Sequence, residues 1–552
     1  MSYLYEKYAK ATYGEDGQLL DIKLNVPENF NFGFDCVDYL GTTKPEKVAM
    51  RWENVAGDMR TYTFKDIMEE SARTANYFKS MGIKKGDRVL VILKRHYQFW
   101  FTIVALHKIG AIIVPATHQL MTKDIVYRVN AAGITAVVAT TDDELADNVD
   151  AAQKDSPTLV TKICVNKKRE GWEFFDEGIA KQSPVFERPT GDDATYADEP
   201  MIMYFTSGTT GYPKIASHSH AYAIGHISTA RWWHNVDPDG IHLTVADTGW
   251  GKAVWGKLYG QWMCEAAVLV YDYDRFVAND LLNLFAKYKI TTFCAPPTIY
   301  RFFIKEDLSK YDLSSLKYAT TAGEALNPEV YNKFYEATGV KLMEGFGQTE
   351  TTLTIANYVG SQPKPGSMGK PSPQYDMCLM DGEGKPVVTG QVGEICINIE
   401  NGIPYGLFQG YYRDQEKTDE VMYDGYYHTG DMAWRDEDGY FWYVGRTDDV
   451  IKSSGYRIGP FEIESVIMEL PYVLECAITG VPDSLRGQVV KATIVLVKGK
   501  EGTEELKKEI QNYVKHKTAP YKYPRVVEFV TELPKTISGK IRRVELRAKD
   551  NK

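Results

Sequence analysis

A loop of glycine and hydroxyl residues that closes at a lysine is the segment of this sequence best suited to chemistry. Residues 200–205, Pro-Met-Ile-Met-Tyr-Phe, predict a short buried strand. The residues that follow are Thr206, Ser207, Gly208, Thr209, Thr210 and Gly211, and Lys214 ends the loop. Such a loop offers backbone N–H groups, hydroxyls and one ammonium group to a polyphosphate. Pro213 and Ile215 flank the lysine, so this is not the common Gly-Lys-Ser/Thr loop, and alone it also fits a plain turn.

A second turn brings together an aromatic ring, a hydroxyl and a carboxylate. It follows a strand predicted at 341–343 and consists of Gly345, Phe346, Gly347, Gln348, Thr349 and Glu350. An aromatic ring can stack on a base, a hydroxyl can contact a phosphate, and a carboxylate is a hard oxygen ligand of the kind that Mg²⁺ prefers. Taken by itself, the segment is also an ordinary turn with a glutamate.

Later segments place single charged residues next to glycines. Asp431 follows Gly430, where a carboxylate suits the two hydroxyls of a ribose or simply caps a turn. Arg446 and Asp448 lie in the charged stretch 445–449. Lys540 follows a Ser-Gly turn that can project it, although most lysines are solvated surface residues.

The elements that must position these residues read as an α/β and α+β fold. Apolar, β-rich runs alternate with segments of helical length between residues 60 and 350, which predicts parallel sheets covered by helices on both faces. The predicted strands are 88–93, 111–114, 136–139, 267–270 and 291–294, and the predicted helices include 64–81 and 279–289. After about residue 365, short strands with glycine turns predict a small antiparallel sheet or barrel. The last hundred residues predict a compact α+β unit with a helix at 460–470 and strands at 475–480 and 491–496.

Together the two turns resemble the signatures of the adenylate-forming superfamily, which includes acyl-CoA synthetases, luciferases and peptide-synthetase adenylation domains. The resemblance extends from about residue 30 to the end. It is closest to the medium-chain acyl-CoA synthetases, on the strength of segments 247–250, 453–460 and 518–525. It implies a large N-terminal domain, residues 1–447, with a β-rich part at about 366–447. It also implies a mobile C-terminal lid, residues 448–552, that turns about Asp448.

The resemblance also assigns roles to residues. Residues 206–214 hold the ATP phosphates, Phe346 packs on adenine opposite Gly323 and Glu324, Thr349 touches the α-phosphate, and Glu350 binds Mg²⁺. Asp431 and Arg446 match the ribose-binding pair, Arg457 an arginine that meets the phosphates, and Lys540 the adenylation lysine. Lys540 and Lys214 are more than three hundred residues apart and must reach one ATP, so the small domain has to close over the large one. The residues that match the CoA surface are Ser454, Gly455, Tyr456, Arg486, Lys515, Tyr523 and Arg525.

The acyl pocket is expected beside Gly347. Acetyl-CoA synthetases carry a tryptophan at the matching position, so a glycine implies open space for a longer or branched acyl chain, with Trp250 as a wall. Phe346 replaces the tyrosine usual in medium-chain relatives. Lys252 and Lys257 stand where some relatives have apolar residues, and either one shortens the pocket or favours a polar acyl group if it points inward.

We therefore predict an AMP-forming acyl-CoA ligase that uses ATP, CoA and Mg²⁺ on a short-chain, medium-chain or branched carboxylic acid. The alternatives are an adenylation enzyme that serves a carrier protein, a luciferase-like oxygenase, and a non-catalytic nucleotide-binding protein. The preferred acid and the oligomeric state stay open. Asp483-Ser484-Leu485 lacks the glycine that precedes a carrier protein's phosphopantetheine site, and His218 and His220 are expected to be structural.

Composition agrees with a globular protein of more than one domain. The chain has 552 residues and a net charge of −10, which argues against general nucleic-acid binding. Residues 501–552 carry a net charge of +5 against −15 for the rest, which indicates either a domain that meets an anionic ligand or a solvated basic face. The seven cysteines include no Cys-x-x-Cys pair, so their spacing predicts neither zinc nor a disulfide framework. No signal peptide or membrane span is predicted, and a cytoplasmic location is expected.

Overall fold

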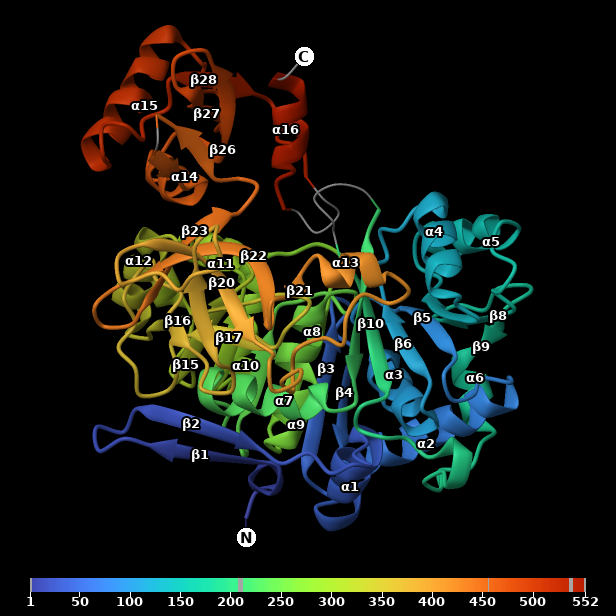
Figure 1. The fold of residues 1–552 in the computed structure, drawn as a ribbon. Helices are drawn as coiled ribbons and strands as arrows, with labels where there is room; N and C mark the ends of the chain where they lie inside the picture. Colours follow the sequence, from blue (N-terminus) through green and yellow to red (C-terminus); the bar gives the residue numbers. More distant parts are fainter. Residues whose placement is uncertain (1, 207–211, 455, 536–539, 551–552) are drawn as a thin grey trace.

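The computed structural model describes residues 2–206, 212–454, 456–535 and 540–550. It consists of a large body and a smaller C-terminal unit that stands above it (Figure 1). The chain starts with the turn η1 (Leu4–Lys7) and a hairpin of β1 (Ala9–Tyr13) and β2 (Leu19–Leu24), which lies along the lower edge of the body in Figure 1. The turns η2 (Gly33–Asp38) and α1 (Tyr39–Thr43) lead into the first sheets.

A seven-stranded sheet forms the first layer of the body. Its strand order is β11-β10-β6-β5-β7-β8-β9, and every pair is parallel except β10 with β11. The strands are β5 (Arg88–Ile92), β6 (Ile112–Pro115), β7 (Ala136–Thr140), β8 (Thr161–Val165), β9 (Glu173–Phe174), β10 (Pro200–Thr206) and β11 (Lys214–Ser219). The helices between them are α2 (Phe64–Ser80), α3 (Gln98–Ile109), α4 (Thr122–Ala132), α5 (Leu145–Gln153) and α6 (Phe175–Ala180), and the turn η3 (Gly191–Asp193) precedes β10.

A nine-stranded sheet forms the second layer, in the order β18-β17-β16-β15-β14-β12-β13-β3-β4. Its centre is parallel and its edges are antiparallel. The strands are β3 (Val48–Asn54), β4 (Met59–Thr63), β12 (Ile241–Thr244), β13 (Ala267–Asp272), β14 (Thr292–Ala295), β15 (Tyr318–Ala322), β16 (Leu342–Gly347), β17 (Leu353–Ala356) and β18 (Lys370–Pro371). The helices and turns of this half are α7 (Tyr222–Ser228), η4 (Thr229–Trp233), α8 (Gly251–Lys257), α9 (Tyr259–Met263), α10 (Ala278–Tyr288), α11 (Pro297–Phe303), η5 (Leu308–Lys310) and α12 (Pro328–Thr338).

Alternating side chains explain why both sheets are covered on two faces. Val89 and Val91 of β5 belong to the core between the sheets, whereas Leu90 and Ile92 belong to a second core with residues of α4 and α5. In the same way, Leu269 of β13 joins a third core that includes residues of α10, α11 and α12. Successive side chains of a strand point to opposite faces, so a continuous apolar run requires cover on both.

A small antiparallel sheet follows the nine-stranded sheet, as the glycine turns predict. It contains β19 (Met377–Met380), β20 (Val392–Asn398), β21 (Met422–Tyr423), β22 (Tyr426–Arg435) and β23 (Phe441–Arg446). The short helix α13 (Gln415–Asp419) precedes β21. This sheet carries Asp431 and Arg446 on neighbouring strands as Cα partners, so it brings together two residues that the sequence pairs only by resemblance.

The C-terminal unit begins after a turn at residues 447–449. Its strands are β24 (Ile451–Ser453), β25 (Tyr456–Ile458), β26 (Val473–Asp483), β27 (Gly487–Leu496) and β28 (Val526–Val530), and its helices are α14 (Pro460–Ile467), α15 (Glu504–Lys517) and α16 (Arg543–Asp550). A hydrophobic core that runs from Ile451 to Phe529 lies wholly within this unit.

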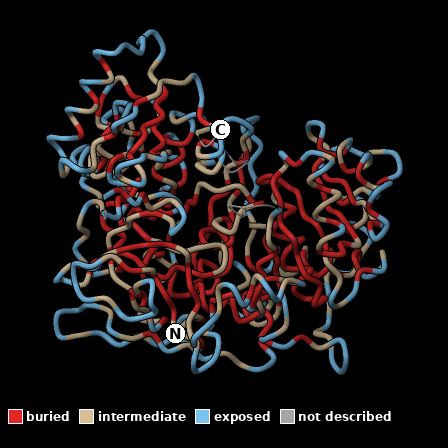
Figure 2. Tube along the Cα trace, turned by 45° about the horizontal axis from the view of Figure 1, so that its top comes forward, coloured by how far each residue is buried: buried red, intermediate tan, exposed pale blue. Residues whose placement is uncertain are grey.

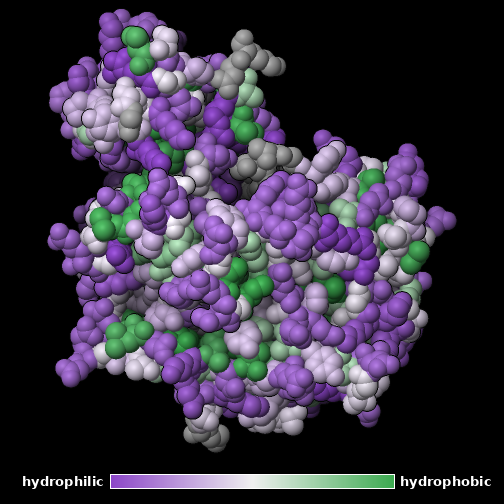
Figure 3. All heavy atoms as spheres, in the orientation of Figure 1, coloured by the Kyte–Doolittle hydropathy of each residue, from purple (hydrophilic) through white to green (hydrophobic). Residues whose placement is uncertain are grey.

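The predicted strands and helices named above are confirmed, with ends that differ by a few residues. Buried residues fill the interior of the body, and a smaller group lies inside the C-terminal unit (Figure 2). The face shown in Figure 3 is mainly hydrophilic, with hydrophobic residues in small separate groups. Among the described residues, no helix has the length and apolar character needed to cross a membrane.

Candidate active site

The polyphosphate loop connects the two antiparallel strands at the edge of the first sheet. Thr206 ends β10 and faces Lys214, the first residue of β11, as its Cα partner. The predicted phosphate-binding residues Ser207, Gly208, Thr209, Thr210 and Gly211 lie outside the described residues. Lys214 is half-buried, and burial lowers the pKa of its ammonium group while the nearby Glu350 carboxylate opposes that shift.

Tyr411 connects Lys214 to Glu350. The Lys214 ammonium group donates a hydrogen bond of 2.9 Å to the Tyr411 hydroxyl, which in turn donates one of 2.9 Å to Glu350 Oε1. The lysine nitrogen also lies 4.0 Å from the centre of the Tyr411 ring. The predicted polyphosphate lysine and the predicted magnesium ligand are therefore held by one buried phenol.

Segment 408–412 explains how Tyr411 reaches this place. It pairs with the free edge of β11 through hydrogen bonds from Gln409 N to Ser217 O at 2.8 Å and from Tyr412 N to Ile215 O at 2.8 Å. The backbone N–H of Phe408, at the start of the segment, donates to Glu350 O at 2.8 Å. The segment thus joins the lysine strand to the glutamate turn by its main chain as well as by Tyr411.

A buried histidine fixes the same turn from the other side. His218 of β11 donates from Nε2 to the carbonyl oxygen of Thr349 at 2.7 Å, and its ring stacks on Tyr222 at 3.9 Å between centroids. Burial lowers the pKa of His218 to about 4, so the imidazole is neutral at working pH. His218 therefore positions the turn, and His220 is also buried, as expected for structural histidines.

Asp431 is the centre of a polar network at the predicted ribose site. Its carboxylate accepts hydrogen bonds from Gln348 Nε2 at 2.5 Å, Tyr443 OH at 3.0 Å and Arg446 Nη1 at 3.2 Å. Burial raises the pKa of the Asp431 carboxyl, and Arg446 opposes that shift. Phe346 lies beside Tyr443, with their ring centres 6.3 Å apart. The aromatic, amide and carboxylate groups predicted to meet the nucleoside are thus close together.

Lys540 lies close enough to this network to lower the pKa of Asp431 electrostatically. The charge of Lys540 therefore acts on the predicted ribose site, and its role as the adenylation lysine stays a prediction. Asp448 lies in the turn between the two units and contacts Arg446 on one side at 4.0 Å and Arg547 of α16 on the other at 3.8 Å. Asp449 forms ion pairs with Arg543 and Arg547.

Three further predicted nucleotide contacts differ in their surroundings. Gly323 has a positive φ of 104°, and a Cβ at this position would meet no atom within 4 Å. Glu324 is exposed and lies 3.4 Å from Arg301. Arg457 is exposed and interacts electrostatically with Asp381. In this arrangement Arg457 faces the small sheet, so its predicted contact with phosphates stays a prediction.

The residues predicted to bind CoA fall into two groups on the C-terminal unit. Tyr456 stacks on Tyr521 at 4.1 Å, and the backbone N–H of Ser454 donates to the carbonyl of Arg486 at 3.0 Å. Lys515 and Arg525 lie over the ring of Tyr523, and Arg525 Nη1 donates to its hydroxyl at 2.8 Å. Gly455 lies outside the described residues.

The open space predicted beside Gly347 is filled, and that expectation is corrected. A Cβ on Gly347 would lie 2.5 Å from the indole of Trp255, because that ring packs directly against the glycine. Nearby is a cavity of only about 10 Å³, which holds about one water molecule. The cavity is lined by Trp233, His234, Thr244, Lys252, Trp255, Gly256, Cys294 and Ala322. The predicted wall, Trp250, precedes α8 and is not among these residues.

The two lysines of α8 take different directions. Lys252 lines the cavity and donates to the carbonyl of Ala322 at 2.7 Å, whereas Lys257 donates to the carbonyl of Ala246 at 2.6 Å and does not line it. Burial lowers the pKa of both ammonium groups, to about 7 for Lys257. Lys252 is thus the cation at the pocket, and its bond to Ala322 ties α8 to the strand that precedes Gly323.

Sequence reasoning missed Tyr411 and Trp255. Tyr411 lies in the segment Gly-Tyr-Tyr-Arg-Asp, where nothing in the residue order marks the first tyrosine, and its pairing with β11 shows its place. Trp255 did carry a signal: an indole five residues after Trp250, within the short apolar helix α8.

The chain is similar to known proteins over almost its whole length. The AMP-binding enzyme family model matches residues 39–412, and the AMP-binding enzyme C-terminal domain model matches residues 462–540. Acyl-coenzyme A synthetase ACSM3, mitochondrial, of Mus musculus is 40% identical over 566 residues, covering 100% of this chain and 96% of the relative. Acyl-coenzyme A synthetase ACSM4, mitochondrial, of Rattus norvegicus is 42% identical over 532 residues, covering 95% and 91%.

A solved structure gives the same fold. The anthranilate CoA ligase AuaEII in complex with anthranoyl-AMP superposes with a TM-score of 0.85 at 28% identity, covering 95% of this chain and 98% of that one. The predicted fold class, with its sheets, helices and separate C-terminal unit, is confirmed.

The substitution Tyr411→Phe tests the link between Lys214 and Glu350. It keeps the ring but removes both hydrogen bonds of the hydroxyl, and bonds to charged groups are worth about 1.5–3 kcal/mol each. We expect the affinity for ATP with Mg²⁺, measured by isothermal titration calorimetry, to fall at least about tenfold. The neighbouring Tyr412→Phe is the control and should bind as the wild type does. If Tyr411→Phe bound ATP with Mg²⁺ as tightly as Tyr412→Phe does, the link between Lys214 and Glu350 would have no part in nucleotide binding.

Proposed function

The chain belongs to the AMP-binding enzyme family, and we propose that its site around Lys214, Glu350 and Asp431 activates a carboxylic acid with ATP and passes the acyl group to CoA. The observation that carries this proposal is the convergence of three groups from distant segments. Gln348 and Glu350 connect the Asp431 network to the Lys214–Tyr411–Glu350 chain, and the charge of Lys540 lowers the pKa of Asp431. The relatives' names, acyl-coenzyme A synthetases, support the reaction class that the sequence predicts.

In the first half-reaction, an oxygen of the acid attacks the α-phosphorus of ATP, the bond to the β-phosphate oxygen breaks, and pyrophosphate leaves. Lys214 and the loop before it are suited to hold the β- and γ-phosphates. Glu350, oriented by Tyr411, is suited to hold Mg²⁺, which offsets phosphate charge. Lys540 then neutralises charge that builds on the α-phosphate and carboxylate oxygens, and a fixed donor of this kind contributes about 3 kcal/mol, or 10²–10³ in rate.

In the second half-reaction, the sulfur of CoA attacks the acyl carbonyl carbon, a C–S bond forms, and AMP leaves. Lys540 is proposed to serve only the first half-reaction, so the C-terminal unit must turn to bring its CoA residues inward. Asp448 is suited to be the pivot because it contacts both Arg446 of the body and Arg547 of the C-terminal unit. The cations Arg486, Lys515 and Arg525 suit the phosphates of CoA.

The acid is proposed to be short or branched. Trp255 occupies the space beside Gly347 and leaves a cavity of about 10 Å³, so a long straight chain has no room unless the indole moves. The relatives' names place those proteins in mitochondria, while a cytoplasmic location stays the prediction for this chain.

An end-point assay with ATP, Mg²⁺, CoA and a panel of acids tests the proposal. We expect acyl-CoA, AMP and pyrophosphate in equal amounts, with butyrate or branched short acids ranked above octanoate. A bound acyl adenylate without thioester would identify an acceptor other than CoA, such as a carrier protein. Absence of nucleotide turnover with every acid would instead favour a nucleotide-binding protein.

Trp255→Ala tests what sets the length of the acid. Removing the indole opens the space against Gly347, and one methylene in an apolar pocket is worth about 1–3 kcal/mol. We expect the ratio of kcat/KM for hexanoate over butyrate to rise at least about tenfold. Trp442→Ala, which changes a tryptophan of β23 away from the cavity, should leave the ratio as it is. An unchanged ratio in Trp255→Ala would place the end of the acyl chain elsewhere.

Lys540→Ala separates the two half-reactions. Because Lys540 is the proposed donor to the α-phosphate and carboxylate oxygens, its loss should reduce acyl adenylate formation by at least about 10²-fold. Thioester formation from a supplied acyl adenylate and CoA should be nearly unchanged. Gly455→Leu should have the reverse effect, since a side chain there would obstruct the pantetheine arm of CoA. Equal loss of both half-reactions in Lys540→Ala would contradict the two-position arrangement.

A further inference from the structure

The small antiparallel sheet places two thiols and an imidazole in one row across three strands. Cys378 of β19 is the Cα partner of Cys396 of β20, and Cys396 is the Cα partner of His428 of β22. Directly opposed residues have Cβ atoms about 4.5–5.5 Å apart and share a face of the sheet. This row lies outside the groups that the proposed reaction uses.

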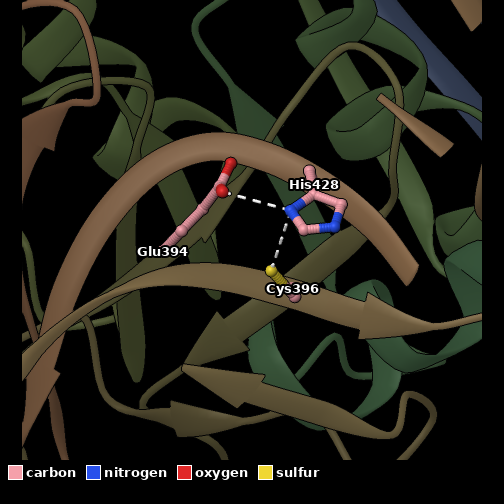
Figure 4. Close-up of side chains that lie close together, drawn as sticks. All are labelled: Glu394, Cys396 and His428. Atoms are coloured by element: carbon pink, nitrogen blue, oxygen red, sulfur yellow. Dashed lines mark hydrogen bonds and ion pairs between the residues drawn. The ribbon is translucent and has the colours of Figure 1, made fainter. Parts of the chain in front are cut away.

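A carboxylate completes the group. The register of β20 against β22 shifts between Glu394 and Cys396, and both side chains point toward the His428 ring (Figure 4). Glu394 Oε2 lies 3.1 Å from His428 Nδ1, and Cys396 Sγ lies 3.5 Å from the same nitrogen. The three ligand atoms all lie within 4.8 Å of one another.

These separations are those of a metal site. Zinc binds nitrogen at about 2.0–2.1 Å, carboxylate oxygen at about 2.0–2.2 Å and thiolate sulfur at about 2.3 Å. Tetrahedral geometry then holds nitrogen and oxygen about 3.3 Å apart and nitrogen and sulfur about 3.5 Å apart. His428 Nδ1 carries either one hydrogen or one lone pair. It therefore cannot form full hydrogen bonds to both Glu394 and Cys396.

The surroundings orient the ligands. The second oxygen of Glu394 accepts the backbone N–H of Gly430 at 2.8 Å, which leaves Oε2 for the site. The ring of Tyr423 stacks on His428 at 3.8 Å and an angle of 3°, so the imidazole plane is fixed. Cys396 and His428 are buried, while Cys378 is partly exposed and gives access from solvent.

We propose that Glu394, Cys396 and His428 bind one thiophilic divalent cation of the Zn²⁺ type, and that Cys378, which stands opposite Cys396 but outside this group of three, turns inward as the fourth ligand. The sulfur and nitrogen ligands distinguish this site from the all-oxygen setting that suits Mg²⁺ at Glu350. Gly430 precedes Asp431 on β22, so the cation fixes the strand that carries the proposed ribose-binding carboxylate.

Cobalt titration of the full chain, stripped of metal with a chelator and kept reduced, tests the proposal. We expect one Co²⁺ per chain, with thiolate-to-cobalt charge-transfer absorption and the visible bands of tetrahedral Co²⁺, and Zn²⁺ should abolish these bands. Cys396→Ser should lose the charge-transfer band together with stoichiometric binding. Cys378→Ser should keep a weaker band and bind at least about tenfold less tightly.

His516→Gln is the matched control, because His516 is an exposed histidine of α15 far along the chain from this sheet. It should titrate as the wild type does. Failure of the wild type to bind Co²⁺ with a charge-transfer band would overturn the proposal, and so would an unchanged band in Cys396→Ser. If Cys396→Ser does not fold, the cobalt spectrum of the wild type and the cobalt affinity of Cys378→Ser still test the proposal.

Discussion

The hydrogen-bonded chain from Lys214 through Tyr411 to Glu350 is the constraint on which the rest of the site depends. A partly buried ammonium group and a carboxylate from different sheets are costly to desolvate unless each has a partner. The phenol supplies one partner to both, and its ring lies in an apolar cluster with Ala216, Phe408 and Tyr427. That cluster joins the edge of the first sheet to the small antiparallel sheet. The polar link is therefore held in place by the same packing that fixes how the sheets meet.

The position of the turn 345–350 follows from this meeting of sheets. Its carbonyls are fixed by His218 of β11 and by the backbone of Phe408, while Gln348 reaches β22 and donates to Asp431. One turn thus has partners on three sheets. A one-residue shift in the pairing register of any of these strands would move its side chains to the opposite face of the sheet. The phosphate and ribose ends of the site would then be separated.

Local signals in the sequence were enough for the strands and helices. Apolar runs such as 88–93 specify strands with two covered faces. The second signature, Gly345 through Glu350, is only in part a turn, because β16 continues to Gly347, and most of the first signature lies outside the described residues. The failures concern contacts made between distant segments. A glycine at position 347 leaves space for the acyl chain only where no other side chain fills that space. The indole of Trp255 fills it. Likewise, the cysteine spacing contains no zinc pattern, because Cys378, Cys396 and His428 become neighbours only through the register of three strands. The register of strands that are distant in the sequence is set by the tertiary fold, so the residue types alone do not predict it.

The proposed rotation of the C-terminal unit requires that the unit keep its own fold while its contacts with the body change. Its main core, from Ile451 to Phe529, draws on no residue of the body. Contacts across the boundary include the edge-on pair of Tyr443 with Phe461 and a hydrogen bond of 3.1 Å from Asn327 to the carbonyl of Ser465. Polar and edge-on contacts of this kind are typical of domains that move relative to one another. A hydrophobic core shared between the two units would prevent such movement. The electrostatic attraction between Lys540 and Asp431 favours the present position of the C-terminal unit.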